Sequence, residues 1–403
     1  MQSLKKNYSA TIYASFTGYI VQAIINNFIP LLFLTFQRDY QISLDKISLL
    51  ITFNFGIQLL VDLVAAAVVD KIGYRICVVA AHLFAAAGLL LLPVLPGVFG
   101  DPFAGLLAAV MVYAVGGGLI EVLISPIVEA CPTQNKSSVM SLLHSFYCWG
   151  QAGVILLSTL FFTLAGIGNW KILACVWAVV PVANAVLFSL VPINQLGQEQ
   201  GEKGMTIPQL VRSRTFWIMM LLMVCAGSCE QGISQWASAF AEAGLGVSKT
   251  AGDLAGPCAF ALLMGLSRVF YAKFSERIDL VKFMAFSGAL CLMSYLLAAL
   301  SPLPVFGLVG CALCGFSVGV LWPGTFSIAA AAIRGGGTAM FALLALAGDV
   351  GCSGGPTYVG FVANAAGGSL KIGMLAGTLL PVLLLIGLSL CAAQNRKQGV
   401  KIR

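Results

Sequence analysis

The chain has 403 residues, of which 59% are hydrophobic and only 9% are charged, and its formal net charge is +7. A soluble domain carries about 25% charged residues, and one this apolar would expose more hydrocarbon than a folded surface tolerates, which excludes an ordinary soluble protein. The basic excess forms no cluster interleaved with exposed aromatic residues, so we expect no nucleic-acid partner and take the lipid bilayer as the solvent.

Apolar stretches long enough to cross a bilayer, which takes about 20 residues, recur along the whole chain. The twelve stretches are residues 9–36, 44–69, 76–97, 102–130, 137–166, 170–192, 215–243, 248–274, 280–301, 303–333, 337–366 and 369–393. The first carries polar groups and lacks a small-residue cleavage site, so we interpret it as a membrane span and not as a signal peptide. The sequence therefore predicts an all-α membrane protein with twelve transmembrane helices.

The most polar internal connection, which contains NQLGQEQGEKG, leaves six stretches before it and six after it. This division is typical of transporters built from two related bundles. We expect an N-terminal six-helix bundle over residues 1–192, a cytoplasmic linker over 193–214 and a C-terminal six-helix bundle over 215–403, related by pseudo-symmetry.

The placement of lysine and arginine predicts the orientation, because cytoplasmic loops carry an excess of both. With both termini inside, 16 of the 22 basic residues are cytoplasmic, five lie on the other side, and Arg268 lies within a span. We expect both termini in the cytoplasm and the chain in a bacterial inner (plasma) membrane.

The cysteines do not form a recognisable metal or disulfide pattern. Most of the twelve lie inside apolar runs, and the CxxC of Cys311 and Cys314 has neither a second pair nor a histidine partner. We expect buried thiols, no metal and no cofactor.

The loop between the second and third stretches reads AAAVVDKIGYR over residues 65–75. Asp70, Lys71, Gly73 and Arg75 reproduce the acid–base–x–Gly–x–base core of the major facilitator loop signature, and the chain resembles that superfamily. The family's leading glycine is Ala66 here. The resemblance implies alternating access, with a glycine turn and charges that form a cytoplasmic latch between helix ends.

The corresponding loop of the second half is YAKFSERIDLVK, residues 271–282. It keeps Lys273, Glu276 and Arg277 but lacks the glycine. We assign gating to Lys273 and Arg277. Arg268, about one turn before Lys273, either anchors the same cytoplasmic gate, which we favour, or binds an anionic substrate.

A finer resemblance is to the fucose-permease-like branch of sugar–proton symporters. The fourth stretch, GGGLIEVLISPIVEA, is similar to that branch's Gly–x–x–Glu–x–x–x–x–Pro arrangement, with Glu121 as the membrane-embedded glutamate. The first stretch carries Asn26 and Asn27, similar to the branch's paired asparagines. An acid that assists proton coupling in the branch is replaced by Pro30.

The fifth and tenth stretches extend this resemblance. In SLLHSFYCWGQAG, His144 and Tyr147 lie where the branch often has amide side chains, and LWPGTFSIA of the tenth stretch is similar to a family segment. Trp322 in that segment and Trp236 in the seventh stretch either stack on a sugar ring or pack against other helices.

Charged residues inside the spans are few, and a charge that faces lipid costs about 2.5–3.5 kcal/mol even on insertion scales. They are Asp62, Glu121, Glu230, Asp253, Arg268 and Asp349. In the resembled fold the first, fourth, seventh and tenth helices line the cavity and the second, fifth, eighth and eleventh flank it. All six charges fall on these helices; His82 on the third is interpreted as a hydrogen-bonded structural histidine.

Helical spacing gathers amides into stripes. Asn54, Gln58 and Asp62 form one stripe, and Tyr19, Gln22 and Asn26 form another. Glu230 aligns with Ser234, and a neighbouring row comprises Ser228, Gln231 and Gln235, ending beside Trp236. The stripes line a path for a polar substrate, which we favour, or hydrogen-bond between helices.

Glu121 is the leading candidate for carrying a proton, because a low-dielectric site disfavours the charged form of a carboxyl group. A salt bridge or a structural glutamate is the alternative. Asp349, Glu230 and Asp62 are further candidates, and Asp349 either binds a proton or pairs with a flanking helix. Coupling follows if protonation and substrate binding together permit a closure that the empty charged protein avoids.

The leading functional hypothesis is import of a small polar solute, such as a sugar or polyol, by proton symport through a functional monomer. The alternatives are export of amphipathic compounds or metabolites by exchange, and a non-transporting receptor with the same fold. The chain has no HExxH, no Gly–x–Ser–x–Gly and no phosphate-binding loop, so we do not expect an enzyme.

Overall fold

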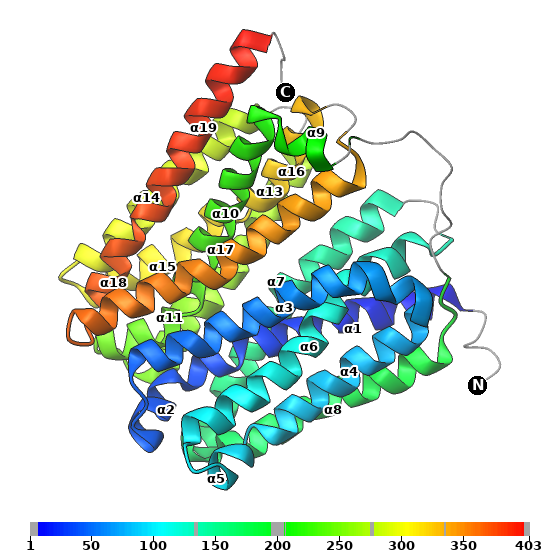
Figure 1. Ribbon diagram of the computed structural model, residues 1–403. Helices are drawn as coiled ribbons and strands as arrows, with labels where there is room; N and C mark the ends of the chain where they lie inside the picture. The colour runs from blue at the N-terminus through cyan, green and yellow to red at the C-terminus, as the bar shows by residue number, and fades with distance from the viewer. Residues whose placement is uncertain are drawn as a thin grey trace. The chain divides into compact units, whose positions relative to one another are not determined.

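The computed structural model describes residues 7–132, 136–194, 205, 207–274, 278–333 and 336–398, and these residues form helices and connecting turns without a β-strand (Figure 1). The chain divides into two compact units, Met1–Glu199 and Gln200–Arg403. The boundary falls inside the segment 193–214.

The helices of the first unit follow the first six apolar stretches. They are α1 (Tyr8–Asn27), η2 (Ile29–Leu32), α2 (Phe33–Tyr40), α3 (Leu44–Ile72), α4 (Tyr74–Leu91), α5 (Leu95–Val98), α6 (Pro102–Glu129), α7 (Lys136–Ala165), η3 (Ile167–Asn169) and α8 (Trp170–Leu190). Side-chain caps begin two of the long helices: Asn7 accepts from the backbone N–H of Ala10, and Asp101 accepts from that of Phe103.

The second unit opens with a short helix and continues with the other six stretches. Its helices are α9 (Ile207–Val211), α10 (Arg214–Ser234), α11 (Ala237–Ala239), η4 (Phe240–Gly244), α12 (Lys249–Asp253), η5 (Leu254–Cys258), α13 (Ala259–Phe274), α14 (Leu280–Leu300), α15 (Pro304–Val318), α16 (Leu321–Ala332), α17 (Gly337–Ala365), α18 (Leu370–Gly377) and α19 (Leu379–Gln398).

Eleven helical segments among the described residues are long and apolar enough to cross a membrane. The remaining predicted span is the 29-residue helix α17. The prediction of an all-α protein with twelve transmembrane helices is therefore confirmed.

Several spans are interrupted, which hydropathy alone does not detect. The first breaks after α1, where Pro30 lies at the start of η2 and cannot donate a backbone hydrogen bond. The seventh breaks at Gln235 and Trp236, and its continuation η4 is a π-helix. The eighth contains the π-helical segment η5 with Pro257. Such local π-helix often accompanies functional sites.

Each unit has its own packed core. In the first unit α6 packs against α4, α3 and α1, and α1 packs against α7 (Figure 1). In the second unit α10 packs against α17 and α19, and α14 packs against α15. Large apolar side chains such as Leu60, Leu157 and Leu300 are exposed, as expected for surfaces that face lipid. All twelve cysteines are free thiols; eleven are buried, as predicted, whereas Cys175 is exposed.

Candidate functional site

A network of amide side chains joins α1 to α3 in the first unit. Asn26 Oδ1 accepts from Asn54 Nδ2 at 3.0 Å and from Gln58 Nε2 at 3.1 Å. Gln58 Nε2 also donates to Asn54 Oδ1 at 3.0 Å, and Gln58 Oε1 accepts from Gln22 Nε2 at 2.8 Å. None of the four side chains belongs to a residue more than 5% exposed. The polar stripes of the two helices therefore bond to each other.

The network ends at the carboxylate of Glu121 on α6. Gln22 Nε2 donates to Glu121 Oε2 at 3.3 Å, and Glu121 itself is half-buried. Asp62, also half-buried, lies one turn beyond Gln58 on α3. The hydrogen bonds thus connect five predicted site residues on three helices, namely Gln22, Asn26, Asn54, Gln58 and Glu121. The donors and acceptors of this cluster suit a hydroxyl-rich solute.

Three consecutive glycines on α6 allow this cluster to form. A Cβ atom at Gly117 would lie 3.0 Å from Gln58 Cδ and 3.3 Å from Gln22 Oε1. A Cβ at Gly116 would lie 2.4 Å from the carbonyl oxygen of Ala81 on α4, and one at Gly118 2.9 Å from that of Gln58 on α3. Gly116 therefore allows the close approach of α4, and Gly117 and Gly118 allow that of α3, with Gly117 also leaving room for Gln22 of α1.

The rings of Tyr19 and His144 form an aromatic pair beside Ser125, which lies one turn from Glu121 on α6. The Tyr19 hydroxyl is 3.2 Å from Ser125 Oγ, and the Tyr19 ring centroid is 5.4 Å from that of His144 on α7. His144 is exposed and Tyr147 is half-buried. His144 is therefore accessible and Tyr147 is partly covered by protein, and His144 borders the polar cluster through Tyr19.

Asn27, the neighbour of Asn26, is engaged differently. Its Nδ2 donates to the carbonyl oxygen of Ala23 in its own helix at 2.9 Å. This bond satisfies the amide locally, whereas Asn26 connects two helices. The adjacent asparagines of the sequence thus have separate structural roles.

The second unit contains a pair of opposite charges. Arg268 Nη2 on α13 lies 3.7 Å from Glu230 Oε2 on α10, and Arg268 Nε donates to the carbonyl oxygen of Gly319 at 3.3 Å. A row of amides continues from the carboxylate: Gln231 Nε2 donates to Glu230 Oε1 at 3.3 Å, and Gln235 Nε2 donates to Gln231 Oε1 at 3.0 Å. The sequence identified these residues as candidates but not the pairing of Arg268 with Glu230.

The two candidate tryptophans pack against α17. Trp236 is fully buried, and its Nε1 donates to the carbonyl oxygen of Pro356 at 2.9 Å. Trp322 is half-buried, and a Cβ atom at Gly348 would lie 2.1 Å from its ring. Asp349, the next residue on α17, is 8% exposed. Packing, one of the two roles considered for these tryptophans, is therefore present for both.

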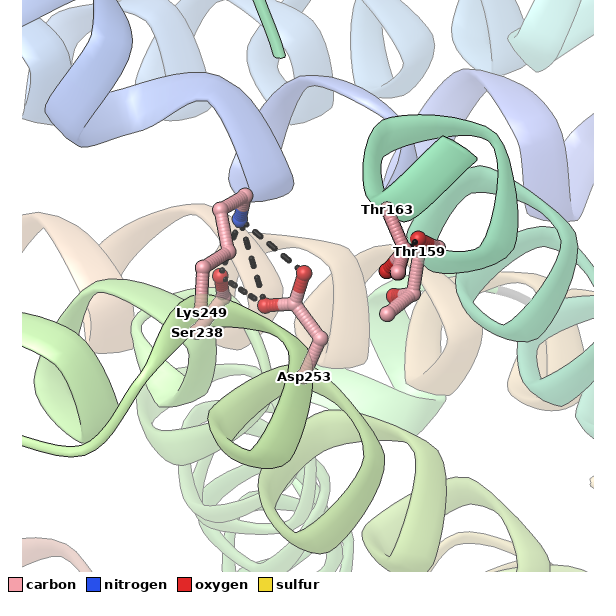
Figure 2. A network of polar contacts seen from close by, with 5 residues as sticks. All are labelled: Thr159, Thr163, Ser238, Lys249 and Asp253. Carbon is pink, nitrogen blue, oxygen red and sulfur yellow. Dashed lines mark hydrogen bonds and ion pairs between the residues drawn. The ribbon is translucent and has the colours of Figure 1, made fainter. Parts of the chain in front are cut away.

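A buried ion pair near the start of the eighth span was not identified as a site from the sequence (Figure 2). Lys249 Nζ lies 3.0 Å from Asp253 Oδ2 and 3.2 Å from both Asp253 Oδ1 and Ser238 Oγ. Ser238 Oγ also donates to Asp253 Oδ1, and Asp253 is 1% exposed. The spacing of four residues between Lys249 and Asp253 could have revealed the pair.

The cytoplasmic loop signature is described in part. Gly73 has φ 97° and makes the turn between α3 and α4. Arg75 donates to the carbonyl oxygens of Phe188, Ser189 and Val191, at 2.8, 2.9 and 2.8 Å, and so caps the end of α8. Lys273 is exposed at the end of α13. The side chains of Asp70 and Lys71, and all of Arg277, lie outside the described residues.

His82 is a structural residue. It is fully buried, its Nδ1 is 2.7 Å from the carbonyl oxygen of Val78, and its Nε2 is 2.8 Å from Asn184 Nδ2. Since the carbonyl only accepts, Nδ1 carries the proton and Nε2 accepts from Asn184. Within the described residues, no group of three or more His, Cys, Asp and Glu side chains could hold a metal ion.

Comparison with solved structures shows what the fold is similar to. A bacterial homolog of the human lysosomal transporter Spinster, inward-facing and unoccupied, matches at a TM-score of 0.76 with 15% identity, covering 98% of each chain. The E. coli fucose:proton symporter FucP matches at a TM-score of 0.64 with 16% identity, covering 94% of this chain and 98% of that one. At such identities the likeness concerns the fold.

Comparison of the sequence with curated proteins finds no match. The sequence profile of the Major Facilitator Superfamily, in contrast, matches residues 12–356. The helical architecture and this match agree, and the chain is a multi-pass membrane transporter that belongs to the Major Facilitator Superfamily.

Proposed function

We propose that this transporter imports a small polar solute, a sugar or a polyol, together with a proton. The observation that carries the proposal is the half-buried carboxylate of Glu121 at the end of the amide network formed by Gln22, Gln58, Asn26 and Asn54. A carboxyl group that is connected to a substrate-binding network can make solute binding depend on its own protonation.

The amides supply the specificity for a polar solute. Carboxamides both donate and accept hydrogen bonds, as hydroxyl groups do. The second unit contains a similar row of its own in Glu230, Gln231 and Gln235. A wholly apolar cargo would have to pack against these polar groups without forming any hydrogen bond to them, whereas a hydroxyl-bearing solute can bond to them.

The structural neighbours are compatible with this function. FucP is described as a fucose:proton symporter, and the Spinster relative as a homolog of a lysosomal transporter. The bias of 16 basic residues on one side of the predicted topology against five on the other supports cytoplasmic termini. We infer that the protein resides in a bacterial inner membrane with this orientation.

The experiment is uptake of labelled monosaccharides and polyols into proteoliposomes that contain the purified protein. An inward proton gradient should drive accumulation of one of them against its own gradient, and a protonophore should abolish it. Solute accumulation that does not depend on the proton gradient, or solute flux that runs only outward, would contradict import by proton symport.

The matched variant is Glu121→Gln, which keeps the shape of the side chain and removes its titration. We expect loss of gradient-driven accumulation, with exchange of labelled for unlabelled solute retained. Accumulation at the wild-type level in this variant would exclude Glu121 as the proton carrier.

A further inference from the structure

The hydrogen bonds of the two glutamines run outward from Gln22, to Glu121 on one side and through Gln58 to the asparagines on the other. Gln22 Nε2 gives its hydrogens to Gln58 Oε1 and to Glu121 Oε2. Gln58 Nε2 gives its hydrogens to Asn26 Oδ1 and Asn54 Oδ1. Each of the two glutamines therefore donates twice, and the carboxylate at the end of the network only accepts. This polarity fits an ionised Glu121.

One acceptor of the network is left over. Within the part of the chain that the structure describes, Gln22 Oε1 is buried without a hydrogen-bond partner, on a residue that is 3% exposed. It lies beside α6, 3.3 Å from where a Cβ atom of Gly117 would be. Buried polar groups are normally hydrogen-bonded, and each exception calls for an explanation. Here the unused acceptor belongs to the amide that contacts Glu121.

Protonation of Glu121 adds a donor beside Gln22. A neutral carboxyl group keeps one oxygen that accepts but gains an O–H that needs an acceptor, and Gln22 now presents an N–H group to it. A half-turn of the Gln22 amide would replace that N–H with the unused Oε1, which accepts from the carboxyl O–H. The terminal torsion of glutamine is broad and two-fold, so such a turn is available to the side chain.

The same half-turn disturbs Gln58. With Gln22 Oε1 in the place of Nε2, two carbonyl oxygens would face each other, because Gln58 Oε1 is the present acceptor at 2.8 Å. Turning the Gln58 amide restores a bond there and brings its oxygen toward Asn26 and Asn54. Asn26 and Asn54 must then exchange their donors and acceptors as well. The reversal therefore passes from Glu121 on α6 to the amides of both asparagines.

We propose that Gln22 is the positioning residue that transmits the protonation of Glu121 to Gln58, Asn26 and Asn54 by reversing its amide. The network would thereby offer the solute one arrangement of donors and acceptors when Glu121 is charged and the opposite one when it is neutral. This inference rests on the proposed function in one respect, that Glu121 takes up the transported proton.

Other titratable groups border the network and belong to the same pH response. Tyr19 on α1 contacts Ser125, which lies one turn from Glu121 on α6, and the ring of Tyr19 lies beside that of His144 on α7. Tyr147 is one turn from His144 on α7. Asp62 is one turn from Gln58 on α3, and His82 on α4 is held by Val78 and Asn184. Gln22 differs from them in having an amide group that donates directly to Glu121.

The test is infrared difference spectroscopy of the protein in lipid vesicles, recorded between alkaline and acidic buffer without any solute. We expect a carboxyl C=O band at acidic pH that Glu121→Gln removes. A change in the glutamine amide bands, identified by isotope-labelled glutamine, should accompany it. Gln22→Met should remove the amide change. Gln151→Met, at a buried glutamine that takes part in none of the network's hydrogen bonds given above, should retain it.

A second variant keeps every amide. Gly117→Ala adds a methyl group within 3.3 Å of Gln22 Oε1 and should weaken the amide change while the carboxyl band remains. An amide change that persists in Gln22→Met, a Glu121 band without any amide change, or no Glu121 band at all would each overturn the relay. Proton-driven uptake by the same vesicles decides the proposed function separately, so the two can fail independently.

Discussion

The guanidinium group of Arg268 lies 3.7 Å from the carboxylate of Glu230, although the two residues lie on different helices, α13 and α10. Their side chains are 24% and 10% exposed, so both charges are largely removed from solvent. Each neutralises a charge that would otherwise be costly inside a membrane. Within the second unit, Arg268 and Glu230 therefore form an ion pair that is largely shielded from solvent.

Replacing one member of this ion pair should lower the stability of the protein more than replacing both. We expect Arg268→Met to lower the thermal stability of the detergent-solubilised protein, because it leaves Glu230 without its countercharge. Breaking a fully buried pair costs about 3–5 kcal/mol, and the partial exposure of Arg268 should keep the loss below that range. Adding Glu230→Gln to Arg268→Met should recover much of the melting temperature.

The double variant also contains the control. If it melts as low as Arg268→Met alone, the stability depends on Arg268 through other contacts, such as its bond to the carbonyl oxygen of Gly319, and the ion pair contributes little. Solute uptake, measured in parallel, shows whether the charges are also needed for transport.

The adjacent asparagines provide a comparison of two amides in one helix turn. Asn26→Ala removes the acceptor of both Asn54 and Gln58, so two buried donors lose a partner, each worth about 1–3 kcal/mol. Under the proposed function these donors are then no longer held in place for the solute, so we expect its apparent affinity to fall by at least about tenfold, or about 1.4 kcal/mol of binding free energy. Concentration-dependent uptake or binding measures the change.

Asn27→Ala is the matched control, because Asn27 bonds only its own helix backbone among the hydrogen bonds described here. We expect its affinity for the solute to stay within about twofold, an effect of less than about 0.5 kcal/mol. Equal losses in the two variants would show that the network around Asn26 is not what determines the affinity.

Glycines bring α10 and α17 into close contact. A Cβ atom at Gly351 would lie 2.1 Å from the carbonyl oxygen of Val224, whereas one at Gly354 would meet no atom within 4 Å. Gly351→Ala should therefore separate the two helices and lower stability by about 1–3 kcal/mol, seen as a lower melting temperature. Gly354→Ala should be tolerated, and equal effects of the two changes would contradict this packing.

The helical spacing of the sequence predicted which amides share a face, as with Asn54 and Gln58, and hydropathy predicted all twelve spans. Contacts between distant segments were not predictable in this way. Nothing in the spacing indicates that Gln22 bonds to Glu121 or that Arg268 reaches Glu230, because these pairs depend on the rotation and closeness of separate helices. The breaks near Pro30 and at Trp236 were also missed, since an interrupted helix can be as apolar as a continuous one.

The ion pair of Lys249 and Asp253 should contribute more than a similar pair on the surface (Figure 2). The side chains of Lys249 and Asp253 are 18% and 1% exposed, whereas those of Lys282 and Asp279 are 85% and 41% exposed and their charges lie 3.5 Å apart. Lys249→Met leaves the buried carboxylate of Asp253 without this cation, and we expect a clear fall in melting temperature. Lys282→Met should have almost no effect, because exposed pairs are screened by water and salt. High salt should leave the difference between the two variants intact; if it removes the difference, Lys249 and Asp253 interact as a solvent-exposed pair would.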